Sequence, residues 1–322
     1  MTLERLSATV FAAFAACVAN IVSLRAADIL NEGFPYSVAI VGKIESGDYD
    51  KLRKELENGS ATSIHIASTG GNVAEAIKIG RLIRALNIKT VIPAKYSKEV
   101  RDSLARIIAQ LFPRRYYATK NAKDNYMCAS ACFFIFVSGI EKSFDWSGLE
   151  DEPILGIHRP FMPDSDLKRF NANQAMASAK TLRTLVETYL KEMDVPAKYS
   201  DLMFSTPSSQ MRWITTSEFR DDFEGFVPSL RDWMNAKCDS RTDIEKLAQQ
   251  MLGNKSHVQM TDKERQLSDL LAKKYVEKIR CESAAHDGLI REAHEKIWPP
   301  NVIMPSIARC IVNPESCKEQ PK

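Results

Sequence analysis

The sequence is poor in histidine and has almost no excess of charge of either sign. Its 322 residues include five histidines, and no histidines and cysteines cluster at metal-ligand spacing, which argues against a dedicated metal site. The formal net charge of +3 is too close to neutral to indicate a nucleic-acid partner. Internal repeats and low-complexity tracts are also missing, and we expect no cofactor. The remaining composition, 44% hydrophobic and 26% charged, is that of a globular protein.

The first 27 residues have the pattern of a secretory signal peptide. A short basic start is followed by an uncharged, mostly apolar stretch over residues 6–24, with cleavage expected near Ala26 or Ala27. Arg25 fits such a cleavage site poorly. An uncleaved membrane anchor stays open because the stretch is just long enough to span a bilayer. The stretch also fits a lipoprotein attached at Cys17 or a buried N-terminal helix. We therefore expect a periplasmic or secreted protein, with a membrane tether through this segment as the alternative.

Cysteine usage agrees with export. Seven cysteines are present, and removal of the segment with Cys17 leaves an even number, which permits disulfides in an exported chain. Cys128 and Cys132 could touch on a helix, but bridging them there would strain the disulfide, so we expect free or separately paired thiols. Two bridges could form among the four C-terminal cysteines, with the pairing left open: Cys238, Cys281, Cys310 and Cys317.

From residue 36 onward, strand-like and helix-like stretches alternate. Short apolar runs predict strands at 38–41, 64–67 and 88–93, and helical spacing predicts helices between them at 48–56 and 73–86. This order implies parallel strands joined by helical crossovers, and so an α/β class. Residues 96–121 interrupt the alternation and are interpreted as an insertion.

The second half begins with residues 128–139, which are dense in small and apolar residues and fit a buried helix or a strand equally well. A strand is predicted at 154–158, between two prolines. Thr215 and Thr261 each precede a glutamate by three residues, the spacing of a helix-capping pair. Amphipathic helices are predicted over 167–193, 214–222, 243–252 and 261–285.

Two short segments have the composition of a hydrolytic site. Gly70 and Gly71 lie in a turn between a predicted strand and helix, where their backbone N–H groups can point at a polarised carbonyl. Ser130 is flanked by alanines at the start of an apolar segment, as a nucleophile open to a substrate would be. A helix beginning there would stabilise developing negative charge. An ordinary glycine turn and a serine packed in a buried helix are the structural alternatives, and a cysteine nucleophile is a further possibility.

A third segment could supply a general base. His158 ends an apolar strand and is followed by Arg159 and Pro160, so its ring is positioned rather than mobile. A general base must be held within hydrogen-bond reach of the nucleophile. A lone histidine at such a place can also be a core or surface residue with no chemical role.

In this order the three segments resemble the Clp proteolytic-subunit family, within the wider Clp/crotonase fold. The Gly70-Gly71 turn resembles the family's Ser-Pro-Gly-Gly turn, with Thr69 in place of the proline. Residues 128–131, Cys-Ala-Ser-Ala, resemble its Ala-Ala-Ser-Met nucleophile segment, and residues 157–160, Ile-His-Arg-Pro, resemble its Ile-His-Gln-Pro base segment. Residues 214–218 and 225–227 resemble the closing unit. The resemblance covers roughly residues 36–230.

The resemblance implies a fold and a domain organisation. The fold is an α/β, Clp/crotonase-like core of repeated β-β-α units with a helical C-terminal extension. After the N-terminal 1–27, the catalytic domain would span residues 28–231, with the insertion at about 96–121. The extension, which contains cysteines, would span residues 232–322. Because proteins of this fold commonly assemble into rings, a homo-oligomer is implied as well.

For the site, the resemblance implies a serine peptidase that cleaves peptide or protein substrates through an acyl-enzyme. Ser130 would be the nucleophile, His158 the base, and the N–H groups of Gly71 and Ala131 the oxyanion hole. The family's acidic position falls near residues 210–211, which carry no carboxylate.

Asp201 is the nearest upstream candidate for that acidic position and Asp194 the next. A serine–histidine dyad is the alternative to a triad. Two further functions stay open for the whole chain. One is a catalytically silent protein of Clp-like fold that binds peptides or assembles with partners. The second is a crotonase-like enzyme that acts on a thioester without a serine nucleophile.

Overall fold

The protein is described by a computed structural model whose described residues are 26–33, 36–57, 61–95, 125–145, 152–161, 168–238 and 260–299. Residues 1–25, with nearly all of the predicted signal or anchor segment, lie outside the described part. So do the predicted insertion at 96–121 and the predicted helix at 243–252. Cys17, Cys310 and Cys317 also lie outside it.

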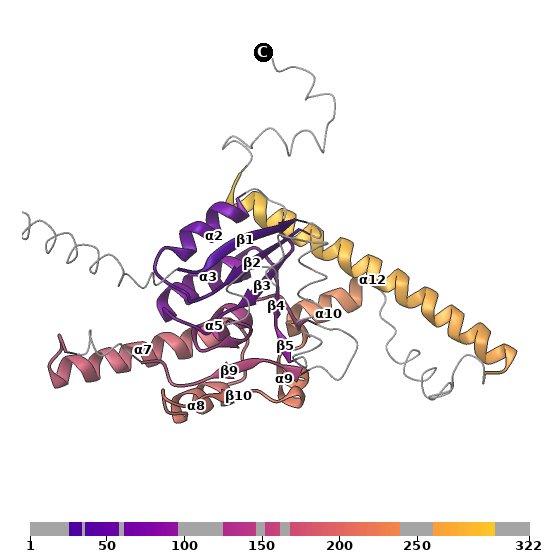
Figure 1. The fold of residues 1–322 in the computed structure, drawn as a ribbon. Helices are drawn as coiled ribbons and strands as arrows, with labels where there is room; N and C mark the ends of the chain where they lie inside the picture. The colour runs from indigo at the N-terminus through magenta and orange to yellow at the C-terminus, as the bar shows by residue number, and fades with distance from the viewer. Residues whose placement is uncertain are drawn as a thin grey trace, which may run out of the picture.

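A six-stranded sheet with the order β1-β2-β3-β4-β7-β11 is the centre of the fold (Figure 1). Its four inner strands are parallel and its two edge strands are antiparallel to their neighbours, which confirms the predicted parallel pairing of the first three apolar runs. The inner strands are β2 (Ser37–Val41), β3 (Ser63–Ala67), β4 (Lys89–Ile92) and β7 (Glu141–Phe144), and the edge strands are β1 (Asp28–Gly33) and β11 (Gly225–Phe226).

The two predicted crossover helices are present as α2 (Asp48–Leu56) and α3 (Val73–Ala85). The side chain of Asn72 caps α3 by accepting a hydrogen bond from the backbone of Glu75, 3.1 Å away. The apolar face of α3 packs against α5 (Ala131–Val137), all of whose residues are buried. The main hydrophobic core therefore lies between the sheet and these helices.

A smaller sheet with the order β10-β9-β6 forms a second layer. Its strands are β6 (Cys128–Ala129), β9 (Leu155–Ile157) and β10 (Arg212–Trp213), and a separate short pair is formed by β5 (Ala94–Lys95) and β8 (Glu152–Pro153). Residues 128–139, which fitted a strand or a helix, form β6 and then α5. The mixed sheet with crossover helices and the helical second half confirm the predicted α/β class with a helical C-terminal region.

The C-terminal half is helical, and α7 and α12 project from the core in opposite directions (Figure 1). Thr215 and Thr261 form the predicted capping boxes. The last helix ends at Ile297 rather than near residue 285, because Ile290 and Ala293 pack onto the body. In the described ranges, no helix combines the length and apolarity needed to cross a membrane. The helices are α7 (Ala172–Glu192), α8 (Lys198–Ser205), α9 (Thr216–Asp222), α10 (Pro228–Lys237) and α12 (Asp262–Ile297).

Candidate active site

The ends of three strands meet beside Ser130. Ser68, which follows β3, bridges Cys128 of β6, and its N–H donates to the Met127 carbonyl at 2.7 Å. Parallel β6 and β9 continue the ladder, and the Ser130 N–H donates to the Gly156 carbonyl at 3.0 Å. Because parallel strands end on the same side, the three segments singled out in the sequence lie at one edge of the second layer.

Ser130 adopts a backbone conformation that residues with a side chain rarely take. Its φ is 57° and its ψ is −122°, in the turn between β6 and α5. Such conformations cost about 1–3 kcal/mol and persist where the surroundings over-determine them, typically at functional sites. Ser130 is partly exposed, while its neighbours Ala129 and Ala131 are buried. A strained, accessible serine between a strand and a helix is the geometry of a nucleophile turn.

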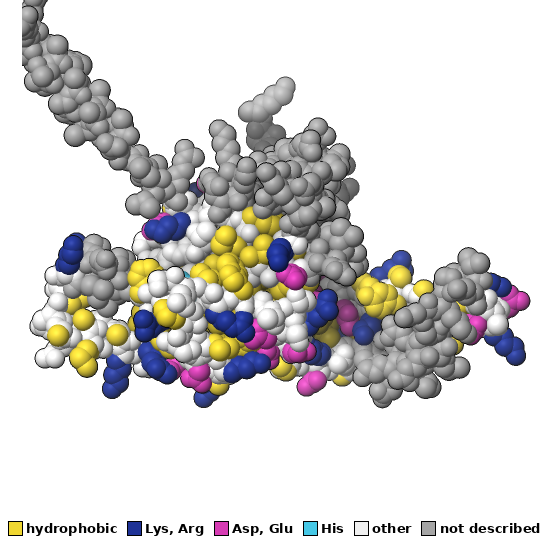
Figure 2. Space-filling view, turned by 60° about the horizontal axis from the view of Figure 1, so that its bottom comes forward, with side chains coloured by type: hydrophobic (Ala, Val, Ile, Leu, Met, Phe, Trp, Pro, Cys, Tyr) yellow, Lys and Arg dark blue, Asp and Glu magenta, His cyan; other side chains and the backbone are white. Residues whose placement is uncertain are grey.

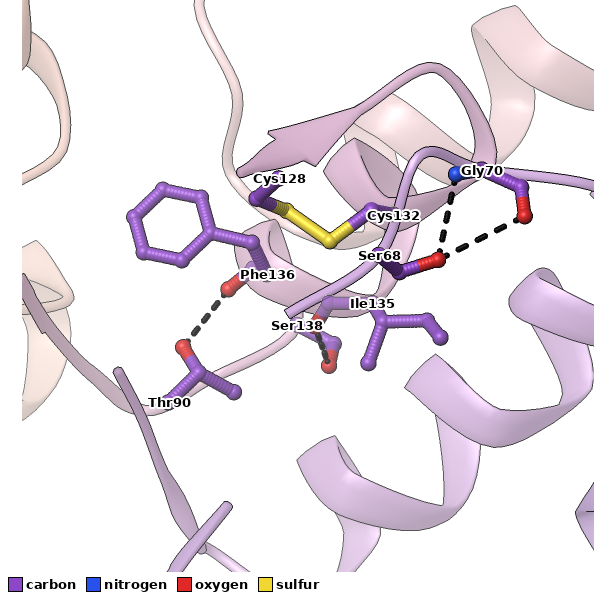
Figure 3. Close-up of a disulfide and its surroundings, with 8 residues drawn as sticks. All are labelled: Ser68, Gly70, Thr90, Cys128, Cys132, Ile135, Phe136 and Ser138. Atoms are coloured by element: carbon purple, nitrogen blue, oxygen red, sulfur yellow. Dashed lines mark hydrogen bonds between the residues drawn. A yellow bond between two sulfur atoms is a disulfide. The ribbon is translucent and has the colours of Figure 1, made fainter. Parts of the chain in front are cut away.

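Gly70 is required by this turn. A Cβ atom at position 70 would lie 2.6 Å from the Ser130 Cβ and 2.9 Å from the Ala129 carbonyl oxygen. The φ of Gly70 is also 107°, a value that other residues rarely adopt. The Gly70 N–H donates to Ser68 Oγ at 3.1 Å, which holds the glycine turn beside the segment 128–132 (Figure 3).

Hydrogen bonds of its two neighbours fix the backbone around Gly71. The Ile44 N–H donates to the Gly70 carbonyl at 2.8 Å, and the Asn72 N–H donates to the Ile44 carbonyl at 2.8 Å. Neither of these bonds uses the Gly71 N–H, and Ile44 and Gly71 form a parallel bridge. In the described part of the chain, no acceptor for it is present.

Ala131 offers a second such amide. It is the first residue of α5, where a backbone N–H has no acceptor within the helix. Among the described residues no other acceptor takes it either. Gly71 and Ala131, whose N–H groups were predicted to form an oxyanion hole, thus each present an N–H group without an acceptor among the described residues.

His158 directly follows β9, one position beyond the residue opposite Ser130 in the strand register. It is buried, and its Nδ1 lies 3.1 Å from the Arg159 carbonyl oxygen. Because a carbonyl oxygen only accepts hydrogen bonds, this contact requires the proton on Nδ1 and leaves Nε2 free to accept. Burial lowers the pKa of His158 and the Arg159 carbonyl partly offsets this, so the neutral ring predominates at pH 7.

The acidic residues proposed from the sequence lie elsewhere. Asp201 is exposed on α8, and none of the described hydrogen bonds or ion pairs joins it to His158. Asp194 accepts from Arg84 Nη1 at 3.0 Å instead. Ser130 Oγ and His158 also share no hydrogen bond within the described residues. Catalytic hydrogen bonds are often long in the absence of substrate and tighten when it binds.

An apolar groove lies next to His158. The Phe161 ring contacts the imidazole with centroids 6.0 Å apart, and its side chain is 60% exposed. Figure 2 shows hydrophobic side chains exposed along the projecting α7, where Met176 is also solvent-exposed. Besides Phe161, the groove is lined by Arg159, Pro160, Ala175, Ala179, Lys180, Leu182, Arg183 and Phe204. Its position beside the histidine fits a side chain of a bound peptide.

The expectation of free or separately paired thiols around Ser130 is wrong. Cys128 and Cys132 form a disulfide with their Cα atoms 5.2 Å apart. The expectation assumed that both residues lie on one helix. Instead the chain reverses at Ser130, so Cys128 ends up on the strand and Cys132 on the first turn of α5 (Figure 3). A second disulfide joins Cys238 after α10 to Cys281 of α12, one of the C-terminal pairings left open.

Sequence reasoning missed two contributors to this site. The Arg159 carbonyl that orients His158 is a backbone group, so no residue pattern reports it. Phe161 carried a weak signal, since it follows the His-Arg-Pro segment directly.

Comparisons with known proteins give a sparse result. No family model matches the chain, and neither does any curated protein. Solved structures of the 1510-N membrane-bound stomatin-specific protease are similar in coarse outline. A serine-to-alanine mutant matches with a TM-score of 0.34 and 14% identity over 62% of this chain and 82% of its own. A lysine-to-alanine mutant in complex with a substrate peptide matches with a TM-score of 0.33 and 15% identity, over 58% of this chain and 69% of its own. Similarity this low carries no inference about activity.

Proposed function

We propose that this chain is a serine peptidase of Clp-like fold, with Ser130 as nucleophile and His158 as general base. The observation that carries the proposal is the Ser130 turn. A partly exposed serine is held at φ 57°, the Gly71 and Ala131 amides have no acceptor among the described residues, and a glycine is required beside the serine. An ordinary buried serine has no need of this strained and crowded arrangement.

The proposed reaction uses these groups in sequence. His158 Nε2 takes the proton from Ser130 Oγ as the oxygen attacks the carbonyl carbon of the peptide bond. The N–H groups of Gly71 and Ala131 stabilise the oxyanion, and the imidazolium then protonates the leaving amine. A water activated by His158 hydrolyses the acyl group on Ser130. Every step uses groups of the chain and water.

The Arg159 carbonyl takes the place of a carboxylate in this proposal. It holds the Nδ1 proton and so fixes the tautomer in which Nε2 is the base. A neutral dipole stabilises an imidazolium less than a carboxylate does, so we expect slower turnover than a full triad gives. Asp201 is not needed for this arrangement.

Peptide or protein substrates and an extracytoplasmic location belong to the same proposal. The apolar groove beside His158 supports a peptide side chain as ligand. Two disulfides in the described residues support folding in an oxidising compartment such as the periplasm or the outside of the cell. Assembly into a homo-oligomer and a tether through the N-terminal segment stay proposals from the sequence.

One observation favours a second candidate, a catalytically silent protein of the same fold that binds peptides. Ser130 and His158 share no hydrogen bond in the described structure, and no carboxylate orients the imidazole. Such a protein would keep the groove and the turn without hydrolysing its ligand.

Labelling with a fluorophosphonate separates the two candidates. The wild type is expected to form a covalent adduct, and Ser130→Ala is expected to form none. Ser283→Ala is the matched control because Ser283 is exposed on α12, whereas the turn lies between β6 and α5, and it should label like the wild type. Failure of the folded wild type to label would overturn the peptidase.

A further inference from the structure

The Cys128–Cys132 disulfide encloses the Ser130 turn. Cys128 lies on β6, which enters the turn, and Cys132 lies on α5, which leaves it. Their bond therefore joins the two arms of the turn and closes a covalent loop over residues 128–132, with Ser130 at its centre. The same disulfide lies beside Ser68 and Gly70, the residues that shape the glycine turn (Figure 3).

Backbone hydrogen bonds tie the turn mainly to neighbouring segments. The Ala129 N–H donates to the Ser68 carbonyl and the Ser130 N–H to the Gly156 carbonyl, whereas the Phe133 N–H donates to the Ser130 carbonyl within the turn, each at 3.0 Å. A residue with a side chain at φ 57° relaxes to a common conformation unless its surroundings over-determine it. A covalent bond between the arms is the strongest restraint available to such a short segment.

The two disulfides of the described residues differ in accessibility. Cys128 and Cys132 are both fully buried in the main core, whereas Cys238 and Cys281 are partly exposed. Dissolved thiols reach a buried disulfide poorly once the protein is folded. The buried bond is therefore suited to a permanent restraint set during folding rather than to a switch toggled in the folded state.

We propose that the Cys128–Cys132 disulfide positions Ser130 for reaction, so that the site becomes competent only when the chain folds with this bond formed. The cysteines act through Ser130 and do not touch substrate. This inference rests on the proposed role of Ser130. It implies that the chain stays unreactive in a reducing compartment and gains its activity on reaching an oxidising one.

Formation of the bond needs an oxidant of the disulfide class. The thiolate of one cysteine attacks an oxidant disulfide and releases one thiol, and the second cysteine then displaces the other. Two protein thiols and one disulfide thus become one protein disulfide and two thiols, and electrons and protons balance. Because both sulfurs end up buried, this exchange has to precede or accompany the packing of α5.

The test compares two matched double variants, Cys128→Ala/Cys132→Ala and Cys238→Ala/Cys281→Ala. We expect the first to label with a fluorophosphonate about tenfold or more slowly than the wild type, since a small misplacement of a nucleophile has large effects. On a peptide substrate its kcat should fall while KM stays unchanged. The second should unfold at a lower temperature yet label at the wild-type rate, because its bond lies far from the turn.

Refolding of the wild type keeps the inference testable if the first variant fails to fold. The chain is refolded from denaturant with dithiothreitol or with a glutathione redox pair, and peptide mapping measures the Cys128–Cys132 bond in labelled and unlabelled molecules. We expect the label to be concentrated in molecules with the bond. Equal labelling with and without it would overturn the positioning role and leave the peptidase standing. Absence of labelling in the oxidised wild type would instead overturn the proposed function.

Discussion

Ser130 is fixed from several directions, whereas His158 is oriented by one neighbouring carbonyl. On the serine side, strand pairing, the glycine turn and a buried disulfide converge on a conformation that would otherwise be unfavourable. On the histidine side, Nδ1 meets the Arg159 carbonyl and the ring packs on an exposed phenylalanine. The proposed nucleophile is thus preorganised by the backbone, while the proposed base depends on a contact that substrate binding can tighten.

The largest effect on labelling is expected from Gly70→Ala, which changes the turn that holds Ser130. The new Cβ would meet the Ser130 Cβ at 2.6 Å and would also force alanine to φ 107°. We expect a loss of at least about 100-fold in labelling of Ser130, the scale of losing an oxyanion donor, with a lower melting temperature. Kinetics of probe labelling and thermal unfolding measure both.

Gly288→Ala is the control for that variant, because a Cβ at position 288 of α12 meets nothing within 4 Å. It should label normally and gain roughly 0.5–1 kcal/mol of stability from the better helix propensity. Equal labelling by Gly70→Ala and Gly288→Ala would show that a Cβ atom at position 70 does not disturb Ser130.

The histidine side is tested by the pH dependence of kcat/KM. Burial lowers the pKa of His158 below its ordinary value of 6.5. The neutral ring is the proposed base, so activity should rise with pH through this lowered pKa and be more than half-maximal at pH 6.5. His158→Ala should abolish this acid limb and most of the activity. An acid limb centred above pH 6.5 would contradict the burial of the ring.

A smaller effect is expected from Phe161→Ala. The ring packs on the imidazole and lines the apolar groove, so its loss should loosen the base and weaken binding of an apolar side chain. We expect kcat/KM to fall about tenfold, within the range that loss of one buried apolar contact gives. Steady-state kinetics on peptides with large and small apolar residues measure it, and an equal fall for both would exclude the groove as a binding site.

The smallest effect is expected from Asp201→Asn. Asp201 is exposed on α8 and makes no contact with the imidazole in the described structure. Without a charge interaction at the base, kcat should stay within about twofold of the wild type, as for most exposed substitutions. A drop of two orders of magnitude would restore Asp201 as the acidic member of a triad.

Much of this architecture was predictable where the local pattern and the tertiary fold agree. The runs that became β2, β3 and β4 are short, apolar and separated by amphipathic helices, so their parallel order followed from the sequence. Strand β1 escaped prediction because Asp28–Gly33 mixes acidic, amide and apolar residues. Its conformation comes from antiparallel pairing with β2, a tertiary effect.

The candidate site likewise has residues that short sequence motifs indicated and backbone features that they did not. Ser130, Gly71 and His158 stand in short motifs at the ends of strands, so the sequence indicated them. The disulfide was mispredicted because the reversal at Ser130 is a backbone feature that spacing does not reveal. The orientation of His158 by the Arg159 carbonyl could not be predicted, because every residue has a main-chain carbonyl.

The most direct test of the central claim is the site of covalent modification. The oxidised wild type is treated with a fluorophosphonate and its intact mass and peptide map are measured. The account predicts a single adduct on Ser130, which disappears when the protein is unfolded before treatment. An adduct on another residue, or none on the folded protein, would contradict it.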